Sequence, residues 1–207
     1  ADNMEATLKK VGVKVLKLTE VNEDFIKEFA PDEIVLATGA NQFVPPIKGV
    51  EGDNVVLAWD VLKGESTVGK NVVIVGGGLV GLEVAETLAE ENKNVTVVEM
   101  LDRVGNGIGW LRGICVHNNI HKLGIKTLTS TKCLEINEDS VLVEKDEDTQ
   151  LIENINSVVI AIGSRANNSL EEFIKSTNIP YHVIGDAVKP RRALDAIWEA
   201  ASIARQI

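Results

Sequence analysis

The stretch from Val72 to Met100, VVIVGGGLVGLEVAETLAEENKNVTVVEM, decides the fold of this chain. A β-branched run ends in three glycines, a segment with helical spacing of its apolar residues follows, and a second β-branched run ends in a glutamate. This pattern predicts a strand over 71–75, a helix over 79–91 and a strand over 95–99. Together they form a β-α-β unit, which is typical of an α/β fold with a parallel sheet.

The glycine segment GGGLVG (76–81) matches the dinucleotide-binding fingerprint at its first, third and sixth positions. The first glycine permits a tight turn, the third lets a pyrophosphate approach the backbone, and the sixth lets the helix lie close to its strand. The free N–H groups and the positive dipole end of the helix then face the phosphates. The expected NAD-binding residues of this segment are Gly76, Gly78, Leu79, Val80 and Gly81. The alternative is a glycine-rich turn in an α/β protein that binds no nucleotide.

Two acids and an arginine belong to the same prediction. Glu99 ends the second strand, roughly 20 residues after the first glycine, where a ribose-binding acid is expected. Its carboxylate favours NAD over NADP because it accepts hydrogen bonds from the adenosine 2′-hydroxyl and repels a 2′-phosphate. Arg103 weakens that preference, since its guanidinium can reach such a phosphate. Glu83, in the first turn of the helix, is either a cofactor contact or an acid that only favours the helix dipole.

Further helices and strands are expected on both sides of this unit. Helices are predicted over 4–10, 24–29 and 117–123 and from about 190 onward, and strands over 11–18, 32–40, 125–130, 133–139, 140–145 and 157–163. A loop rich in proline and glycine follows the strand over 32–40, and residues 62–70 are read as a linker. The last helix places apolar residues such as Leu194 and Ile197 on one face at helical spacing.

Composition limits the classes of partner. The 207 residues are 44% hydrophobic, which predicts a globular chain with a core, and they carry a formal net charge of −10. An acidic chain does not bind nucleic acid or an anionic membrane unaided, because both need an excess of Lys and Arg. No apolar run reaches the roughly 20 residues of a spanning helix. With two cysteines and no signal-peptide pattern, the sequence favours the reducing cytoplasm and a small-molecule partner.

Other residues with chemical potential are discounted. Cys115, His117 and His121 fall within one predicted helix, but a metal site needs a further ligand and a closed geometry. We expect a surface helix there and no metal. No Ser/His/Asp arrangement is visible, and no catalytic acid, base or nucleophile is assigned to this chain.

Further motifs surround the fingerprint in a set order: ATGA (37–40) with the PPIKG loop after it, AIGSRANN (161–168) and IGDA (184–187). With GGGLVGLE they resemble, over essentially the whole chain, the flavoprotein reductases with two dinucleotide-binding domains. The ending VIGDAVKPRRALDAIWEAASIARQI and the segment EMLDRVG are most similar to NADH:flavin oxidoreductases related to old yellow enzyme, the group of 2,4-dienoyl-CoA reductase, enoate reductase and trimethylamine dehydrogenase. The resemblance implies a Rossmann-like NAD-binding domain inserted in an FAD-binding domain of the three-layer β/β/α type.

The resemblance also implies which residues would meet FAD. Gly185, Asp186 and Ala187 would lie against the flavin cofactor, with the Asp186 carboxylate accepting hydrogen bonds from the ribityl hydroxyls. The other role open to Asp186 is that of a cap before the last helix. Thr38 and Gly39 would mark the crossing between the two domains, beside FAD, or else form only a strand-end turn.

On the NAD side, the resemblance places Glu83 near the nicotinamide ring and Gly163 against the dinucleotide. It divides the chain into the first part of an FAD-binding domain (1–66), an NAD-binding domain (67–166) and a return segment of the FAD-binding domain (167–207). The second glycine fingerprint of such enzymes, which holds the FAD adenosine and phosphates, does not occur before Ala37. We therefore expect a C-terminal fragment of a longer enzyme, with an incomplete FAD site.

The leading hypothesis from the sequence is an electron-transfer unit in which NADH gives hydride to FAD. Such a transfer needs two positioned rings and the exclusion of water rather than acid–base groups. Electrons would pass to a centre on the missing N-terminal part, which reduces an activated C=C bond or a similar substrate, and the fragment alone is not expected to complete turnover. An N-terminal FMN domain is the expected partner in the parent chain, and FMN and an iron–sulfur cluster are candidates in the full-length enzyme.

Two alternatives stay open. The first is a pyridine nucleotide-disulfide reductase or NADH oxidase of the same superfamily, with its redox cysteines outside this sequence. The second is a non-catalytic scaffold module that binds an adenine nucleotide.

Overall fold

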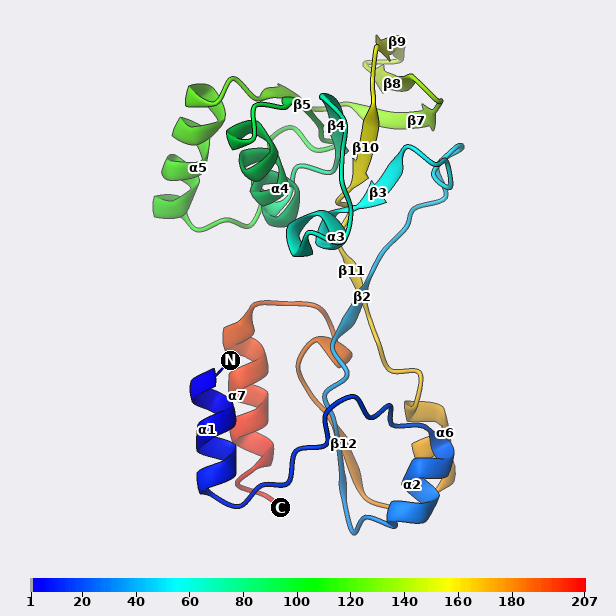
Figure 1. Ribbon diagram of the computed structural model, residues 1–207, viewed down its shortest axis with the longest axis vertical. Coiled ribbons are helices and arrows are strands. Elements are labelled where there is room, and N and C mark those ends of the chain that lie inside the picture. The colour runs from blue at the N-terminus through cyan, green and yellow to red at the C-terminus, as the bar shows by residue number, and fades with distance from the viewer. Residues whose placement is uncertain (1) are drawn as a thin grey trace. The chain divides into compact units, whose positions relative to one another are not determined.

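The computed structural model describes residues 2–207, which form two compact units (Figure 1). The first unit comprises the chain up to Gly39 and from Asn167 to Ile207, and the second comprises Ala40–Ala166. The first domain boundary, predicted at residue 66, lies at Gly39 in the structure. Strand β3 (Val55–Leu57) is hydrogen-bonded into the sheet of the second unit and therefore belongs to that unit.

The second unit is built on a five-stranded sheet in which all neighbouring strands are parallel. In spatial order the strands are β3, β10 (Ser157–Ile160), β4 (Asn71–Val75), β5 (Asn94–Val98) and β6 (Lys126–Leu128). The strand β10, which comes last in the sequence, therefore lies between β3 and β4.

Both faces of this sheet are covered (Figure 1). Helices α3 (Ala58–Lys63), α4 (Leu79–Glu90) and α5 (Trp110–Lys122) pack on one face, and the antiparallel strands β7 (Lys132–Ile136), β8 (Ser140–Lys145) and β9 (Asp148–Glu153) cover the other. Along β4, Val72 and Ile74 pack toward the helices, whereas Val73 and Val75 pack toward the three-stranded sheet. A strand buried on both faces is apolar, and the predicted α/β class with a parallel, Rossmann-like sheet is confirmed.

A short antiparallel pair joins the two segments by which the chain enters and leaves the second unit. It consists of β2 (Ala40–Gln42) and β11 (Ser164–Ala166). Beside it, the Arg165 guanidinium lies 3.9 Å from the centre of the Phe43 ring, and the Trp59 N–H donates to Gln42 Oε1 at 2.7 Å. These contacts fix the pair to the second unit.

The first unit has a parallel two-stranded sheet, β1 (Ile34–Leu36) with β12 (Tyr181–Val183). Its small core contains Ile26, Leu36 and Ile174. The remaining elements of this unit are α1 (Asp2–Lys10), α2 (Glu23–Phe29), α6 (Glu171–Ser176), the 3-10 turn η1 (Gly185–Ala187) and α7 (Ala193–Ile203).

The prediction of a strand over 11–18 is wrong. These residues form turns and irregular chain, and Leu18 adopts a left-handed backbone with φ 54°. No strand of the described residues pairs with the segment, so its backbone groups lack the ladder partners that stabilise extended chain. Its apolar side chains are exposed, with Val11 at 66% and Val13 at 49%. β-Branched alternation alone is therefore not enough to form a strand here.

Candidate functional site

The second unit contains a cavity of about 670 Å³ at the carboxyl ends of its parallel strands. Val75 and Val98, the last residues of β4 and β5, and Ala161, directly after β10, all line it. Open α/β sheets bind their ligands at this edge. The cavity is therefore the candidate site.

The glycine turn between β4 and α4 forms one wall of the cavity. Gly76 has φ +109°, and a Cβ there would lie 2.5 Å from the carbonyl oxygen of Ala161. A Cβ on Gly81 would lie 2.0 Å from the carbonyl oxygen of Gly76, so the helix can approach the turn only without a side chain. Gly78 is different: it begins α4 without any side-chain cap, and the space where its Cβ would point is open. An open cradle beside uncapped helix N–H groups fits a pyrophosphate.

Gly77, which the fingerprint leaves unspecified, is also constrained. Its N–H donates to Glu99 Oε2 at 2.6 Å, and its carbonyl oxygen accepts from the Gly105 N–H at 2.7 Å. A Cβ on Gly77 would lie 2.7 Å from Cγ1 of Val104. The sequence pattern missed this residue because its contacts come from the loop after β5 rather than from the glycine turn.

The Glu99 carboxylate is held at the edge of the cavity by the backbone. Besides the bond from Gly77, its Oε1 accepts from the Leu101 N–H at 2.8 Å. Each carboxylate oxygen has a second lone pair, so hydroxyl groups of a ribose can still bind. The position and chemistry of Glu99 thus fit the predicted ribose-binding acid.

Most, but not all, of the predicted NAD-binding residues line this cavity. Leu79, Val80 and Gly163 do so together with Gly76, Gly78 and Glu99, whereas Gly81 is buried in α4 outside the lining. Arg103 does not, and its guanidinium donates to Asn106 Oδ1 at 3.3 Å. Glu83 also lies outside the lining.

The Glu83 side chain is instead on the surface between two helices. Its Oε1 accepts from Nη2 of Arg112, on α5, at 3.3 Å, and the Arg112 and Glu83 side chains are 61% and 42% exposed. In the structure Glu83 thus links α4 and α5 through an ion pair, and its contact with the nicotinamide stays a prediction.

Several residues of the cavity were not predicted. Pro45, Pro46 and Ile47, from the loop after β2, form part of its wall. This loop is fixed to β7, because the Ile136 N–H donates to the carbonyl oxygen of Lys48 at 2.8 Å. The PPIKG motif marks this loop in the sequence, but nothing in the motif indicates that the loop packs beside the nucleotide-binding turn.

The start of β7 completes the cavity with Thr131, Lys132 and Cys133. Burial raises the pKa of the Cys133 thiol to about 11, so this side chain is a neutral, apolar group at pH 7. These residues are distant from the fingerprint in sequence and reach the site only through the fold.

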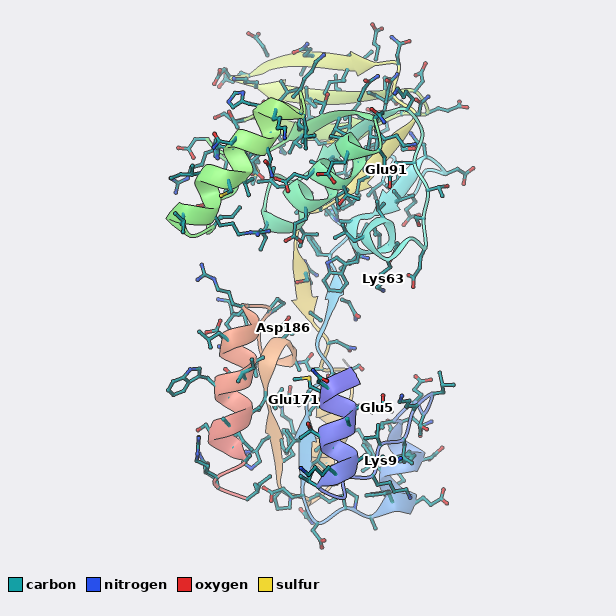
Figure 2. The ribbon with its side chains drawn as sticks, turned by 60° about the vertical axis from the view of Figure 1, so that its left-hand side comes forward. Glu5, Lys9, Lys63, Glu91, Glu171 and Asp186 are labelled. Carbon is teal, nitrogen blue, oxygen red and sulfur yellow. The ribbon has the colours of Figure 1, made fainter. Side chains whose placement is uncertain are left out.

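The residues predicted to meet FAD all belong to the first unit. Gly185, with φ +63°, donates its N–H to Glu199 Oε2 at 2.7 Å, and Ala187 is buried. Asp186 lies in the turn before α7 (Figure 2), where its Oδ1 accepts from the Arg191 N–H at 3.1 Å.

Helix α7 begins at Ala193 rather than near Pro190 as predicted. The Arg192 N–H donates to Oδ2 of Asp195 at 3.1 Å, so a carboxylate of the helix itself accepts a backbone N–H at the N-terminal end of α7. Asp195, at the third helical position, thus caps this end of the helix.

Thr38 and Gly39 lie where two segments of the first unit meet. The Thr38 hydroxyl donates to the carbonyl oxygen of Asn167, and the Asn167 N–H donates to the carbonyl oxygen of Gly39 at 2.9 Å. Gly39 has φ +73°, a left-handed backbone that favours glycine. The two residues thus fix the point where the chain leaves and re-enters this unit.

The histidines and the cysteine of the predicted helix do not form a metal site within the described residues. Nδ1 of His117 lies 3.1 Å from the carbonyl oxygen of Gly113, one turn earlier in α5. Residues 2–207 contain no group of three or more His, Cys, Asp or Glu side chains placed to hold a metal ion. Cys115 is exposed, Cys133 is buried, and both are free thiols. None of the helices in the described part of the chain has the length and apolar character needed to cross a membrane.

Fold and cavity together define a dinucleotide-binding α/β protein of the Rossmann-like type. The profile of the family described as pyridine nucleotide-disulphide oxidoreductase matches residues 2–188, and the chain belongs to this family. Membership supports the binding of FAD and NAD(P) and a role in oxidation–reduction.

Three proteins illustrate the similarity over nearly the whole chain. An NADH oxidase of Thermoanaerobacter brockii is 36% identical, with 100% of this chain and 32% of that protein covered. A cinnamate reductase of Clostridium sporogenes is 34% identical, with 98% and 30% covered. The solved structure of a 2-naphthoyl-CoA reductase matches with a TM-score of 0.90 at 30% identity, covering 98% of this chain and 31% of that one. The chain thus spans less than a third of the length of these relatives.

Proposed function

We propose that this chain is the pyridine-nucleotide-binding part of an NADH-dependent flavin oxidoreductase of the old-yellow-enzyme-related group. The observation that carries the proposal is the cavity of the second unit, where an open glycine cradle and a fixed carboxylate lie on one rim. The names NADH oxidase and 2-naphthoyl-CoA reductase among its relatives support the same donor and a reductase role.

The residues of the second unit would bind and orient NADH. The uncapped N–H groups at the start of α4 would bind the pyrophosphate, with Gly78 leaving room for it. Glu99 would accept hydrogen bonds from the adenosine 2′-hydroxyl. The apolar walls, Pro45 and Ile47 among them, would exclude water from the rings.

FAD, when bound, supplies the acceptor for a hydride from NADH. Toward that group, Asp186 would accept hydrogen bonds from ribityl hydroxyls, with Gly185 and Ala187 beside it. Thr38 and Gly39 would hold the crossing of the chain near the cofactor. This chain contributes positioning and no acid–base group to the transfer.

We further propose that electrons pass from FAD to a centre on the rest of the full-length enzyme. An N-terminal FMN domain with an iron–sulfur cluster is the arrangement implied by the resemblance. The name of the cinnamate reductase favours an activated C=C bond as the final acceptor, since cinnamate carries a C=C bond conjugated to its carboxylate.

A second candidate is an NADH oxidase, which the name of the Thermoanaerobacter brockii relative favours. The two candidates share the NADH site and differ only in the final acceptor. NADH consumption by the full-length enzyme, with oxygen alone or anaerobically with a conjugated enoate, separates them.

The NADH site is tested by a Gly78→Ala substitution. Gly78 has φ −71° and open space around its Cβ position, so alanine fits the fold but places a methyl group where the pyrophosphate would lie. In a fluorescence titration we expect NADH affinity to fall at least about tenfold, the effect of losing roughly 1.4 kcal/mol of binding free energy. The melting temperature of the variant should stay at the wild-type value.

Gly113→Ala is the matched control, because Gly113 also has open space at its Cβ position but lies in α5, away from the cavity. It should leave NADH affinity unchanged. Wild-type protein that does not bind NADH, or Gly78→Ala protein that binds it normally, would contradict the proposal.

A further inference from the structure

We infer that Lys132 lets this cavity accept the 2′-phosphate of NADPH in addition to NADH, and so sets the selectivity between the two nucleotides. The inference rests on the proposed function and adds a residue to it. Its basis is the place of Lys132 beside Glu99 on the cavity rim.

Backbone hydrogen bonds bring these two residues together. The Thr131 N–H donates to the carbonyl oxygen of Glu99 at 2.9 Å, and the Ser130 N–H donates to that of Leu101 at 2.8 Å. The chain entering β7 therefore runs directly alongside the chain leaving β5. Lys132, next to Thr131, lines the same cavity as Glu99.

Glu99 and Lys132 are the two charged residues in the lining of this cavity within the described chain. The Glu99 carboxylate is fixed, because both of its oxygens accept backbone N–H groups. Lys132 is exposed, and no salt bridge within residues 2–207 involves it, although Glu144 lies opposite it in the β7–β8 pair. Arg103, the other nearby cation, is directed to Asn106.

This arrangement has opposite consequences for the two nucleotides. An adenosine 2′-hydroxyl needs only the Glu99 carboxylate. A 2′-phosphate, with a charge of about −2, is repelled by that carboxylate and would be attracted by an ammonium group that the neighbouring Lys132 can bring to it. Because the lysine ammonium lies on a flexible four-carbon stem, it can follow the phosphate. Lys132 therefore offsets the selection against NADPH that Glu99 imposes.

The test compares NADH and NADPH titrations of the wild-type chain and of a Lys132→Gln variant. We expect NADPH affinity to fall about fivefold, the upper range for an exposed charge pair, while NADH affinity stays within about twofold. The NADPH affinity of the wild type should also fall more steeply with salt than that of the variant, because salt screens the exposed charge.

Lys126→Gln is the matched control. It makes the same change in net charge, but Lys126 begins β6 and belongs to the amino edge of the sheet, away from this cavity. It should leave the affinities for both nucleotides unchanged.

The outcomes separate this inference from the proposed function. If wild-type protein binds neither nucleotide, the proposed function fails and the role of Lys132 fails with it. If wild-type protein binds NADH but Lys132→Gln leaves the NADH-to-NADPH affinity ratio unchanged, or Lys126→Gln changes it equally, only the role of Lys132 is overturned.

Discussion

The four glycines at positions 76, 77, 78 and 81 differ in what a side chain at each position would contact. For Gly76 and Gly81 the obstacle is a backbone carbonyl oxygen, and for Gly77 it is the Val104 side chain. Only Gly78 of the four has free space at its Cβ position. The missing side chain of Gly78 therefore leaves room for a ligand, whereas the other three glycines are required by contacts within the fold. A fingerprint read from sequence cannot separate these two reasons.

The two thiols of the chain should differ in reactivity. Burial raises the pKa of Cys133 to about 11, so at pH 8 this thiol stays protonated, whereas Cys115 is exposed. With a chromogenic disulfide reagent at pH 8, we expect one fast-reacting thiol in native protein and two in guanidinium chloride. Cys115→Ser should remove the fast-reacting thiol. Rapid labelling of both thiols in native protein would show that the wall of the cavity at Cys133 is open.

At the scale of helices and strands, local patterns predicted the β4-α4-β5 unit almost to the residue. Its strands are apolar because both faces are buried, and its turn is fixed by steric contacts among glycines. The strands β2, β3 and β11, with three residues each, and the largely exposed β9 were missed, since their sequences show no clear apolar period. The cavity residues at 131–133 were missed because only backbone hydrogen bonds to the chain after β5, distant in sequence, bring them to the site.

The contact between η1 and α7 should depend on pH. The hydrogen bond from Arg191, and then the one from the Gly185 N–H, hold the pKa of Glu199 below its ordinary value of 4.5. A lowered pKa in the folded state gives stability that is fully present above the ordinary pKa and is lost as the pH falls through the lowered one. Glu199→Gln should therefore lower the urea midpoint at pH 7, and the difference from wild type should shrink below about pH 4.5.

Glu28→Gln, at an exposed position of α2, is the control for a general charge effect. It should leave the wild-type pH dependence intact. A Glu199→Gln variant with an unchanged midpoint at pH 7 would mean that this carboxylate does not stabilise the contact.

At the scale of the whole molecule, the two units differ in the size of their cores. The second unit has a buried cluster on each face of its sheet, whereas the buried cluster of the first unit contains Ile26, Leu36 and Ile174. Local stability follows the density of buried apolar contacts. The amides of the second unit should therefore be the slower to exchange with solvent.

Hydrogen exchange with and without NADH tests this difference. The amides of β4, β5 and β10 should be the slowest to exchange, and NADH at about 100 times its Kd should add roughly 2.7 kcal/mol to their protection. All lining residues of the cavity belong to the second unit, so the amides of β1 and β12 should gain no comparable protection. Equal gains in both units would contradict the assignment of NADH to this cavity.

The position of β10 also affects how the chain folds as it is made. This strand joins β3 and β4 in the finished sheet but is the last of the five to leave the ribosome. Until residues 157–160 have emerged, β3 and β4 have no common neighbour. The backbone groups that each of them later pairs with β10 have no strand partner until then. Pairing between segments so far apart in sequence is slow. The nucleotide site therefore forms at the end of the synthesis of its unit, although its fingerprint is made early.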